Sequence, residues 1–502
     1  MSEPTPCPRR YSHRRTIKTL AGVLVIGAAC FALVASGTPG NVTAQGLGDP
    51  DEDIKSMNKA FADYLKSIKD MQKSFLGAEA FALDDAHAVG AYDLITAFMH
   101  SANRNNLSSS GSGRRGYPRF AGFDDPDTRI GVDNPDTQYM GTIVINPDCE
   151  GVWRIWGNRT NTADFILTTF DTGAGAGGGP TLEDEDMVNM NGDPLQLGEN
   201  FVVYAGCGDD PHNPEWGNYS WLELIPAETL QIARRQSMCD WNTEAPGPIH
   251  IERVGTEGVP SAPLSPAVMT EQIYDGIALN EVQAPFWPAF IDTIKQIPVN
   301  TATPWRPTGG LGITTQLNML MWFDLEDDEA LIIRLPDEDY AKYYGLQLSN
   351  MWGSSADWGN RHVSMNWGLD GSCQGELSQP TYHPAQQQIS ATGGGFCGQQ
   401  DAYFIVLSKE DPGVQNWIET AELSQGILAG RLQSVDPADV PDIVGGPGQL
   451  TCALPVAIKV PTAFVKPTLQ QLGASSTGYE DADRAEQLRV RQLYQKNKYV
   501  FW

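Results

Sequence analysis

From Tyr117 onward the chain consists of short runs rich in β-branched and aromatic residues, separated by loops of Gly, Pro, Asp and Asn. Turn residues at such regular spacing predict antiparallel strands. We therefore expect a mainly β fold, an antiparallel jelly roll or β-sandwich body with two β-rich domains. The predicted strands are Tyr139–Ile145, Val152–Trp156, Phe165–Phe170, Phe201–Tyr204, Trp221–Ile225, Leu331–Leu335, Tyr344–Leu348 and Tyr403–Leu407.

Other segments show the apolar spacing of helices. Residues 51–76 carry apolar side chains at steps of three and four, with Lys and Asp between them, and predict an amphipathic helix. Asp84 or Asp85 can cap a second helix through Met99. Residues 265–297 predict a helix between the β-rich regions, and residues 479–499 predict one near the C-terminus.

These elements divide the chain into successive parts. The Gly- and acid-rich stretch 174–200 is predicted to be a loop within the first β-rich region. The parts are 1–44, a signal peptide; 45–116, a helical hairpin and linker; 117–264, the first β-rich domain; 265–300, a helical connection; 301–460, the second β-rich domain; and 461–502, a C-terminal tail or helix.

The N-terminus is typical of an export signal. A basic segment precedes the apolar stretch 20–35, which is shorter than the roughly 20 residues of a membrane span. Small residues at Val42-Thr43-Ala44 predict cleavage after Ala44, and the Arg14-Arg15 context resembles a twin-arginine signal. We expect a secreted or cell-envelope protein without a membrane span after cleavage. Lipidation at Cys30 is the alternative, and Gly27 disfavours it.

Charge and cysteine content narrow the possible partners. The net charge of −28 argues against nucleic acid, because binding to phosphates depends on Lys and Arg. Six cysteines remain after the signal peptide, and their even number in an exported chain predicts three disulfides. Only Cys373–Cys397 is predicted as a pair, because the loop between them is Gly-rich. The six are Cys149, Cys207, Cys239, Cys373, Cys397 and Cys452.

Residues 343–367 form the most unusual segment. It places three Trp among Asn, Asp and Arg side chains without a helical apolar stripe. Aromatic faces beside fixed polar groups suit a polar ring-shaped ligand such as a sugar. The alternative is that the Trp side chains pack a core and the polar groups bond the backbone. The predicted ligand-binding residues here are Asn350, Trp352, Trp358, Asn360, Arg361, Asn366 and Trp367.

A second motif lies at residues 133–139. Asp133-Asn134-Pro135-Asp136-Thr137 repeats the pattern of residues 124–128, and Pro-Asp at its centre predicts a turn. The functional interpretation is that Asn134, Asp136 and Tyr139 project into a ligand site. Calcium binding is an alternative, but the twelve-residue calcium-loop spacing is absent, so we expect no metal. No cofactor motif is found either.

A third motif is Asp411-Pro412-Gly413 followed by Asn416-Trp417, with Arg431 further on. Asp-Pro-Gly predicts a turn, and the alternative to a functional role is a corner packed by Trp417. Together, the three motifs resemble the exported actinobacterial branch of the domain-of-unknown-function family 1214 (DUF1214), which often occurs with family 1254 (DUF1254). The resemblance spans residues 117–433 and implies a β-rich, jelly-roll-like fold. It implies no mechanism.

Several functions remain open. One is a glycoside hydrolase, with Asp136 and Asp357 as candidate catalytic carboxylates, since glycosidic hydrolysis needs an acid and a base or nucleophile. The alternative is a non-catalytic carbohydrate-binding or envelope-assembly protein that uses Trp352, Trp358 and Trp367 as a platform. A hydrolase or carrier for an apolar ligand is weaker, because the G-x-S-x-G motif is missing. The sequence leaves the oligomeric state open.

Overall fold

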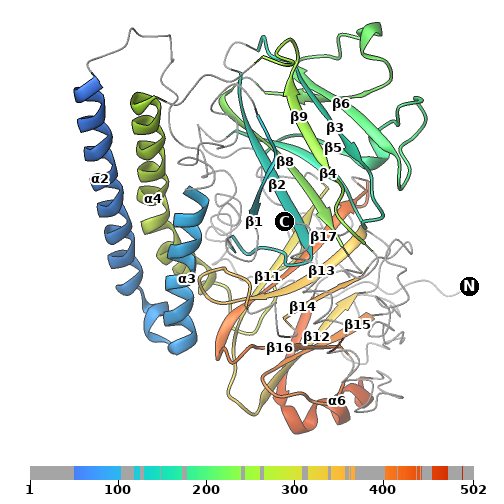
Figure 1. Cartoon of the computed structure of the whole chain (residues 1–502). Coiled ribbons are helices and arrows are strands. Elements are labelled where there is room, and N and C mark those ends of the chain that lie inside the picture. The colour runs from blue at the N-terminus through green and yellow to red at the C-terminus, as the bar shows by residue number, and fades with distance from the viewer. Residues whose placement is uncertain are drawn as a thin grey trace, which may run out of the picture.

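The computed structural model contains two β-rich halves beside a layer of helices (Figure 1). The predicted signal peptide and linker lie outside the described residues, as does almost all of the predicted helix 479–499. The structure describes residues 50–102, 118–124, 129, 131–146, 149–171, 178–225, 227–238, 244–259, 265–307, 315–336, 341–356, 361, 363–367, 402–414, 416–436, 438–440, 443, 455–472 and 489.

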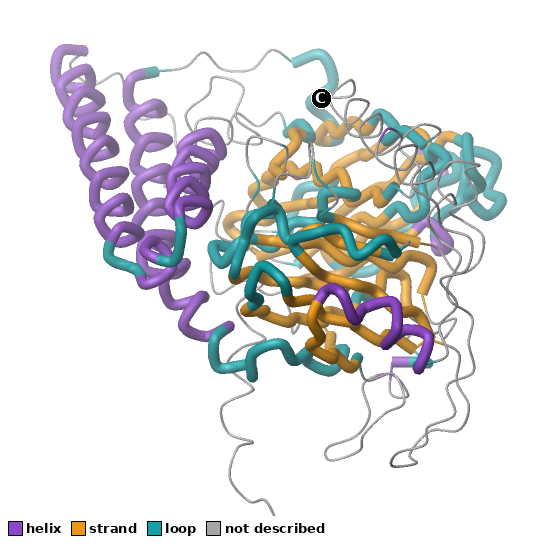
Figure 2. The backbone as a smooth tube through the Cα atoms, turned by 90° about the horizontal axis from the view of Figure 1, so that it is seen from below, coloured by secondary structure: helices purple, strands orange, loops and turns teal. Residues whose placement is uncertain are grey.

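The helical layer consists of α2 (Pro50–Leu76), α3 (Asp85–Ala102) and α4 (Pro266–Ile294), with the 3-10 turn η2 (Glu79–Ala82) between the first two. Asp84 caps α3 as predicted, since its Oδ1 accepts the backbone N–H of His87 at 2.8 Å. Figure 2 shows the three helices on one side of the strands. None of the described helices is long and apolar enough to cross a membrane.

The first half contains two sheets. A five-stranded sheet has the order β1-β2-β8-β4-β5, and a four-stranded sheet has the order β7-β6-β3-β9. All pairs are antiparallel except β6 with β7. The strands are β1 (Ala121–Asp124), β2 (Thr137–Asn146), β3 (Trp153–Asn158), β4 (Ile166–Asp171), β5 (Gly178–Glu183), β6 (Asn200–Cys207), β7 (Ser220–Leu224), β8 (Ala227–Ser237) and β9 (Ile249–Arg253), with 3-10 turns η4 (Asp184–Asp186) and η5 (Pro214–Trp216).

The second half also contains two sheets, ordered β10-β11-β17-β13-β14 and β16-β15-β12-β18. Here the parallel pair is β15 with β16. The elements are β10 (Arg306–Pro307), β11 (Leu317–Asp324), β12 (Glu329–Pro336), β13 (Ala341–Ser349), β14 (Ser364–Trp367), β15 (Ala402–Ser408), β16 (Trp417–Glu419), β17 (Gln425–Val435) and β18 (Val456–Pro461), followed by η6 (Thr462–Phe464) and α6 (Val465–Gln471).

The two halves have the same topology. Each strand of the first half occupies the same place in its sheet as the strand nine numbers later in the second half, including the single parallel pair. Each half buries its own apolar cluster, with Phe201 and Leu230 in one and Phe323 and Leu346 in the other. The chain therefore contains an internal structural repeat, which the sequence did not reveal.

The fold class is confirmed: the protein is mainly β, with an N-terminal helical pair and a C-terminal helix. All eight predicted strands coincide with strands of the structure. The prediction that residues 174–200 form only a loop is wrong, because residues 178–183 form β5 and pair with β4. Gly and Pro weaken the strand signal, and an edge position such as that of β5 tolerates them.

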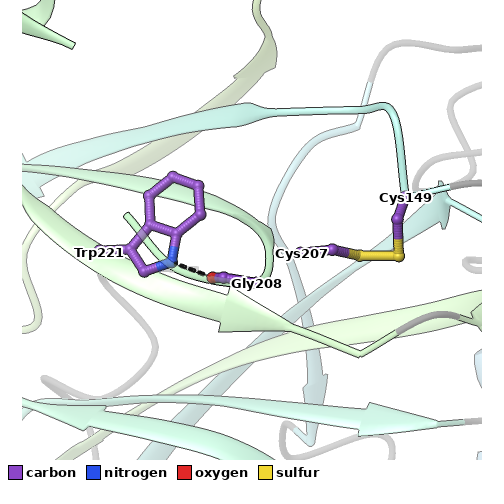
Figure 3. The surroundings of a disulfide bond; sticks show 4 residues. All are labelled: Cys149, Cys207, Gly208 and Trp221. Atoms are coloured by element: carbon purple, nitrogen blue, oxygen red, sulfur yellow. Dashed lines mark hydrogen bonds between the residues drawn. A yellow bond between two sulfur atoms is a disulfide. The ribbon is translucent and has the colours of Figure 1, made fainter. Parts of the chain in front are cut away.

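One disulfide lies within the described residues. Cys149, between β2 and β3, is bonded to Cys207 at the end of β6, 58 positions further on (Figure 3). The predicted pair Cys373–Cys397 lies outside the described residues, as do Cys239 and Cys452.

Candidate functional site

The motifs 133–139 and 350–367 lie in direct contact where the two halves meet, a region that we term the junction. The Asp133 carboxylate accepts the backbone N–H of Ser355 at 2.9 Å and its hydroxyl at 2.6 Å. Arg129 donates to the carbonyl of Ser355 at 3.0 Å. The fold therefore joins the two motifs through hydrogen bonds.

The turn at Asn134 points toward the second half. Its Oδ1 accepts the backbone N–H of Asp136 at 3.1 Å within the predicted turn, and its Nδ2 donates to the Tyr343 hydroxyl at 2.9 Å. Asp136 is half-buried. Tyr139 is fully buried, and the Arg235 guanidinium carbon lies 5.5 Å from its ring centroid.

Asn350 and Trp352 connect the second motif to the helical layer. Asn350 Oδ1 accepts the backbone N–H of Trp352 at 2.9 Å and so holds a tight turn. Trp352 has no exposed surface; its ring stacks on Phe75 at a centroid distance of 5.0 Å. Its indole N–H donates to the carbonyl of His87 at 2.8 Å. The structure thus places Trp352 in the core, with its polar atom paired.

Arg361 lies in a network of ion pairs. Its guanidinium bonds Glu419, two residues after Trp417 of the third motif, and lies 3.6 Å from Glu422. Lys409 continues the network to Glu422 at 3.3 Å and to Asp327 at 2.8 Å. The second and third motifs therefore meet through opposite charges, and these carboxylates would compete with a ligand for the guanidinium.

The remaining predicted residues fall into two groups. Asn366 donates to the carbonyl of Met238 at 3.2 Å, and the backbone of Trp367 pairs with Tyr344 on β13. Met238 in turn donates to the carbonyl of Asp136 at 2.8 Å, so Asn366 also belongs to the junction. Asp357, Trp358 and Asn360 lie outside the described residues.

Asp164 is the most perturbed carboxyl at the junction, and the sequence analysis missed it. It is fully buried, and burial raises its pKa to about 7 although Ser237 donates a backbone N–H to Oδ1 at 2.6 Å. Oδ2 has no hydrogen-bond partner among the described residues. Burial, followed by the charges of Asp136 and Asp164, holds the pKa of Tyr343 well above its usual range.

Buried polar bonds link the ends of the central strands across the junction. Arg235 on β8 donates to Gln316 at 3.0 Å, and the Ser237 hydroxyl donates to Gln433 at 2.6 Å. In the opposite direction, Arg431 on β17 donates to the carbonyl of Val132. These groups lost their water on folding and satisfy one another, so each half helps to fix the other.

The sequence offered only a weak signal for Asp164. It directly precedes the predicted strand Phe165–Phe170, where an acidic residue usually marks an exposed turn. Its burial depends on Tyr343 and Ser237, which are distant in sequence. Within the described ranges, no group of three or more His, Cys, Asp or Glu is arranged to hold a metal ion.

No protein-family model matches the chain, and no curated protein matches it. Among solved structures, an uncharacterised protein from Burkholderia cenocepacia is similar, with 18% identity, a TM-score of 0.63, and coverage of 82% of this chain and 100% of that chain. The VPA0106 protein from Vibrio parahaemolyticus is 12% identical, with a TM-score of 0.39 and coverage of 78% and 100%. The first likeness concerns the fold alone.

Proposed function

We propose that this chain is an exported protein, held at the cell envelope or released, that acts on a glycan by hydrolysing a glycosidic bond. The signal-like residues 1–44 support export. The observation that carries the hydrolytic proposal is that Asp164 and Asp136 are bonded to consecutive residues of the chain: the backbone N–H of Ser237 donates to Asp164 Oδ1 at 2.6 Å, and that of Met238 donates to the carbonyl of Asp136 at 2.8 Å. Membership of family 1214 remains part of the proposal.

Glycosidic hydrolysis requires a protonated acid and a second carboxylate that acts as base or nucleophile. Asp164 suits the acid role, because a pKa of about 7 keeps its proton into the neutral range. Its Oδ2 has no partner in the described part of the chain and can donate that proton to a leaving oxygen. Asp136 would be the second carboxylate, in place of the predicted pair with Asp357.

A substrate must be able to reach these residues. Asp164 and Tyr343 are both fully buried, and Asn134 covers the Tyr343 hydroxyl from the first half. A sugar can therefore reach them only if the two halves separate locally. Such opening would break the bonds from Asn134 and Ser237 to the second half.

The test is release of reducing ends from a panel of polysaccharides. Asp164→Asn and Asp136→Asn should each lower the rate by about 100-fold or more, because each removes a proton-transfer or nucleophilic group. Asp292→Asn on the exposed side of α4 is the matched control and should leave the rate unchanged. If the wild-type protein releases no reducing ends from any substrate, hydrolysis is excluded.

A non-catalytic carbohydrate-binding or envelope-assembly protein is the second candidate. Two observations favour it: Asp133 and Asn134 are bonded within the junction, and Arg361 is paired with Glu419. In this case the junction only holds the two halves together. The wild type would then bind a polysaccharide without cleaving it, and Asp164→Asn would bind it equally well.

A further inference from the structure

No described residue of the three sequence motifs lies on the outer face of the sheet β7-β6-β3-β9. Its inner face packs the core of the first half through Ile155, Val203 and Ile251. The alternate residues of the same strands point away from that core, since successive side chains of a strand face opposite sides. This outer face, from Trp221 on β7 to His250 on β9, is termed the aromatic face.

The corresponding sheet of the second half shows how such a face is normally closed. There α6 packs Val465 and Leu469 over Ala330, Ile332 and other buried apolar residues of β12 and β15. Figure 2 shows this short helix lying against the strands. In the first half, no described α-helix packs closely on the equivalent face.

The aromatic face exposes aromatic and charged side chains, whereas the equivalent face of the second half is apolar. Arg154 lies opposite Tyr204 on one neighbouring strand and Glu252 on the other. In the next row, Trp156 lies opposite His250, and their rings stack at a centroid distance of 5.3 Å. The Arg154 guanidinium carbon lies 4.9 Å from the Trp156 ring centroid and Nη1 lies 3.3 Å from Glu252. Aromatic and charged groups thus alternate across the strands.

The loop between β6 and β7 adds to this face. Trp216 of η5 stacks on Tyr204 at a centroid distance of 4.1 Å and an interplanar angle of 13°. The Tyr219 hydroxyl donates to Asp210 at 2.5 Å, which ties the loop to itself. The Cys149–Cys207 disulfide anchors the base of the loop. A rigid loop lowers the entropic cost of binding.

We propose that the aromatic face binds a glycan chain, with Trp216 and the exposed His250 ring contacting sugar rings and Arg154 and Glu252 bonding hydroxyls. Flat aromatic surfaces supply apolar contact, while charged groups orient a polar ligand. An amphipathic helix fits this face poorly, because it would bury the half-exposed Arg154 and Glu252 against apolar side chains. The ligand class is that of the proposed function, but the surface is separate from Asp164.

The experiment is affinity electrophoresis of the full exported chain in gels that contain arabinogalactan, xylan, glucomannan or dextran. We expect at least one polysaccharide to retard the wild type. Trp216→Ala and His250→Ala should each weaken the apparent affinity about tenfold, because each removes aromatic contact area. His250 is exposed, so its replacement leaves the fold intact. Tyr274→Ala, an exposed aromatic on α4, is the control and should bind like the wild type.

The outcomes separate this proposal from the hydrolytic one. Weaker retardation of Trp216→Ala and His250→Ala, with retardation of Asp164→Asn unchanged, supports the aromatic face whether or not the junction is catalytic. Normal retardation of both face variants overturns the proposal, even if Asp164→Asn abolishes hydrolysis. Absence of retardation by every polysaccharide also overturns it. So does a change in the oligomeric state of the two face variants on size-exclusion chromatography, which would identify the occupant as a second copy of the chain.

Discussion

The two halves share one topology. In each, a tryptophan indole N–H bonds a backbone carbonyl at the corner between the two parallel strands. In the first half, the indole N–H of Trp221 on β7 donates to the carbonyl of Gly208, just after β6, at 2.9 Å (Figure 3). In the second half, Trp417 on β16 donates to the carbonyl of Ser408 at the end of β15 at 3.1 Å. Each tryptophan thus ties a short parallel strand to its neighbour.

The loops at this corner are also alike. Asp210 Oδ1 accepts the backbone N–H of His212 at 2.8 Å, and Asp411 Oδ1 accepts that of Gly413 at 2.7 Å. The third residue of each Asp-Pro-X turn has a left-handed φ, 49° for His212 and 70° for Gly413. The Asp-Pro-X turn is therefore a repeated element, although glycine relieves the backbone strain in only one half.

The halves differ in what stabilises and covers that corner. The first has the Cys149–Cys207 disulfide and an aromatic, charged outer face. The second has no disulfide among its described residues and buries its outer face under Val465 and Leu469 of α6. One strand arrangement can thus be completed either with a disulfide or with apolar burial, and the half with the disulfide keeps partly exposed aromatic and charged side chains on its outer sheet face.

Replacing the two corner tryptophans tests this difference. Trp417 is buried, so Trp417→Ala should lower the free energy of unfolding by about 3–5 kcal/mol. Trp221 is half-buried, and Trp221→Ala should cost about 1–2 kcal/mol. Urea unfolding of both variants provides the measurement. Equal losses would show that burial does not distinguish the two corners.

Removing the disulfide addresses the first half alone. The double variant Cys149→Ser, Cys207→Ser should lower the free energy of unfolding by about 2–4 kcal/mol, because a constraint on a long loop of the unfolded chain is lost. The measurement is denaturant unfolding without reductant. Adding reductant should then destabilise the wild type more than the variant; an equal effect on both would contradict a stabilising role.

The last stability prediction concerns pH. The ordinary pKa of Asp164 is 3.8, and burial raises it to about 7 in the folded protein. Between these values the folded state binds more protons than the unfolded state, so stability should fall as pH rises, by up to about 1.4 kcal/mol per pH unit. The contribution is fully present below about pH 4 and is lost by about pH 7. Both buried carboxyls with a raised pKa, Asp164 and Glu183, belong to the first half among the described residues.

Thermal unfolding between pH 4.5 and 8 checks this prediction. Asp164→Asn should remove much of the slope, because asparagine does not titrate, whereas Asp292→Asn should retain it. An unchanged slope in Asp164→Asn would mean that another group causes the pH dependence.

Local patterns in the sequence predicted the local structure. The period of three to four residues in 51–76 and the turn residues between β-rich runs correspond to α2 and to the strands. Asp84 was predicted to cap α3 and does so, and the turn predicted at residues 133–137 forms, with Asn134 Oδ1 accepting the backbone N–H of Asp136. These features depend on neighbours within a few residues, so the sequence contains the information that decides them.

The tertiary structure alone decided what surrounds each side chain. The sequence left open whether Trp352 stacks on a ligand or packs in a core, and the fold stacks it on Phe75, which is far away in sequence. Asp164 gave no sequence signal because its pKa depends on burial at the junction. The internal repeat was equally hidden: it survives as strand order and as single residues such as Trp221 and Trp417, not as a sequence period. Local propensity determines elements, while burial and pairing depend on contacts made only when distant segments meet.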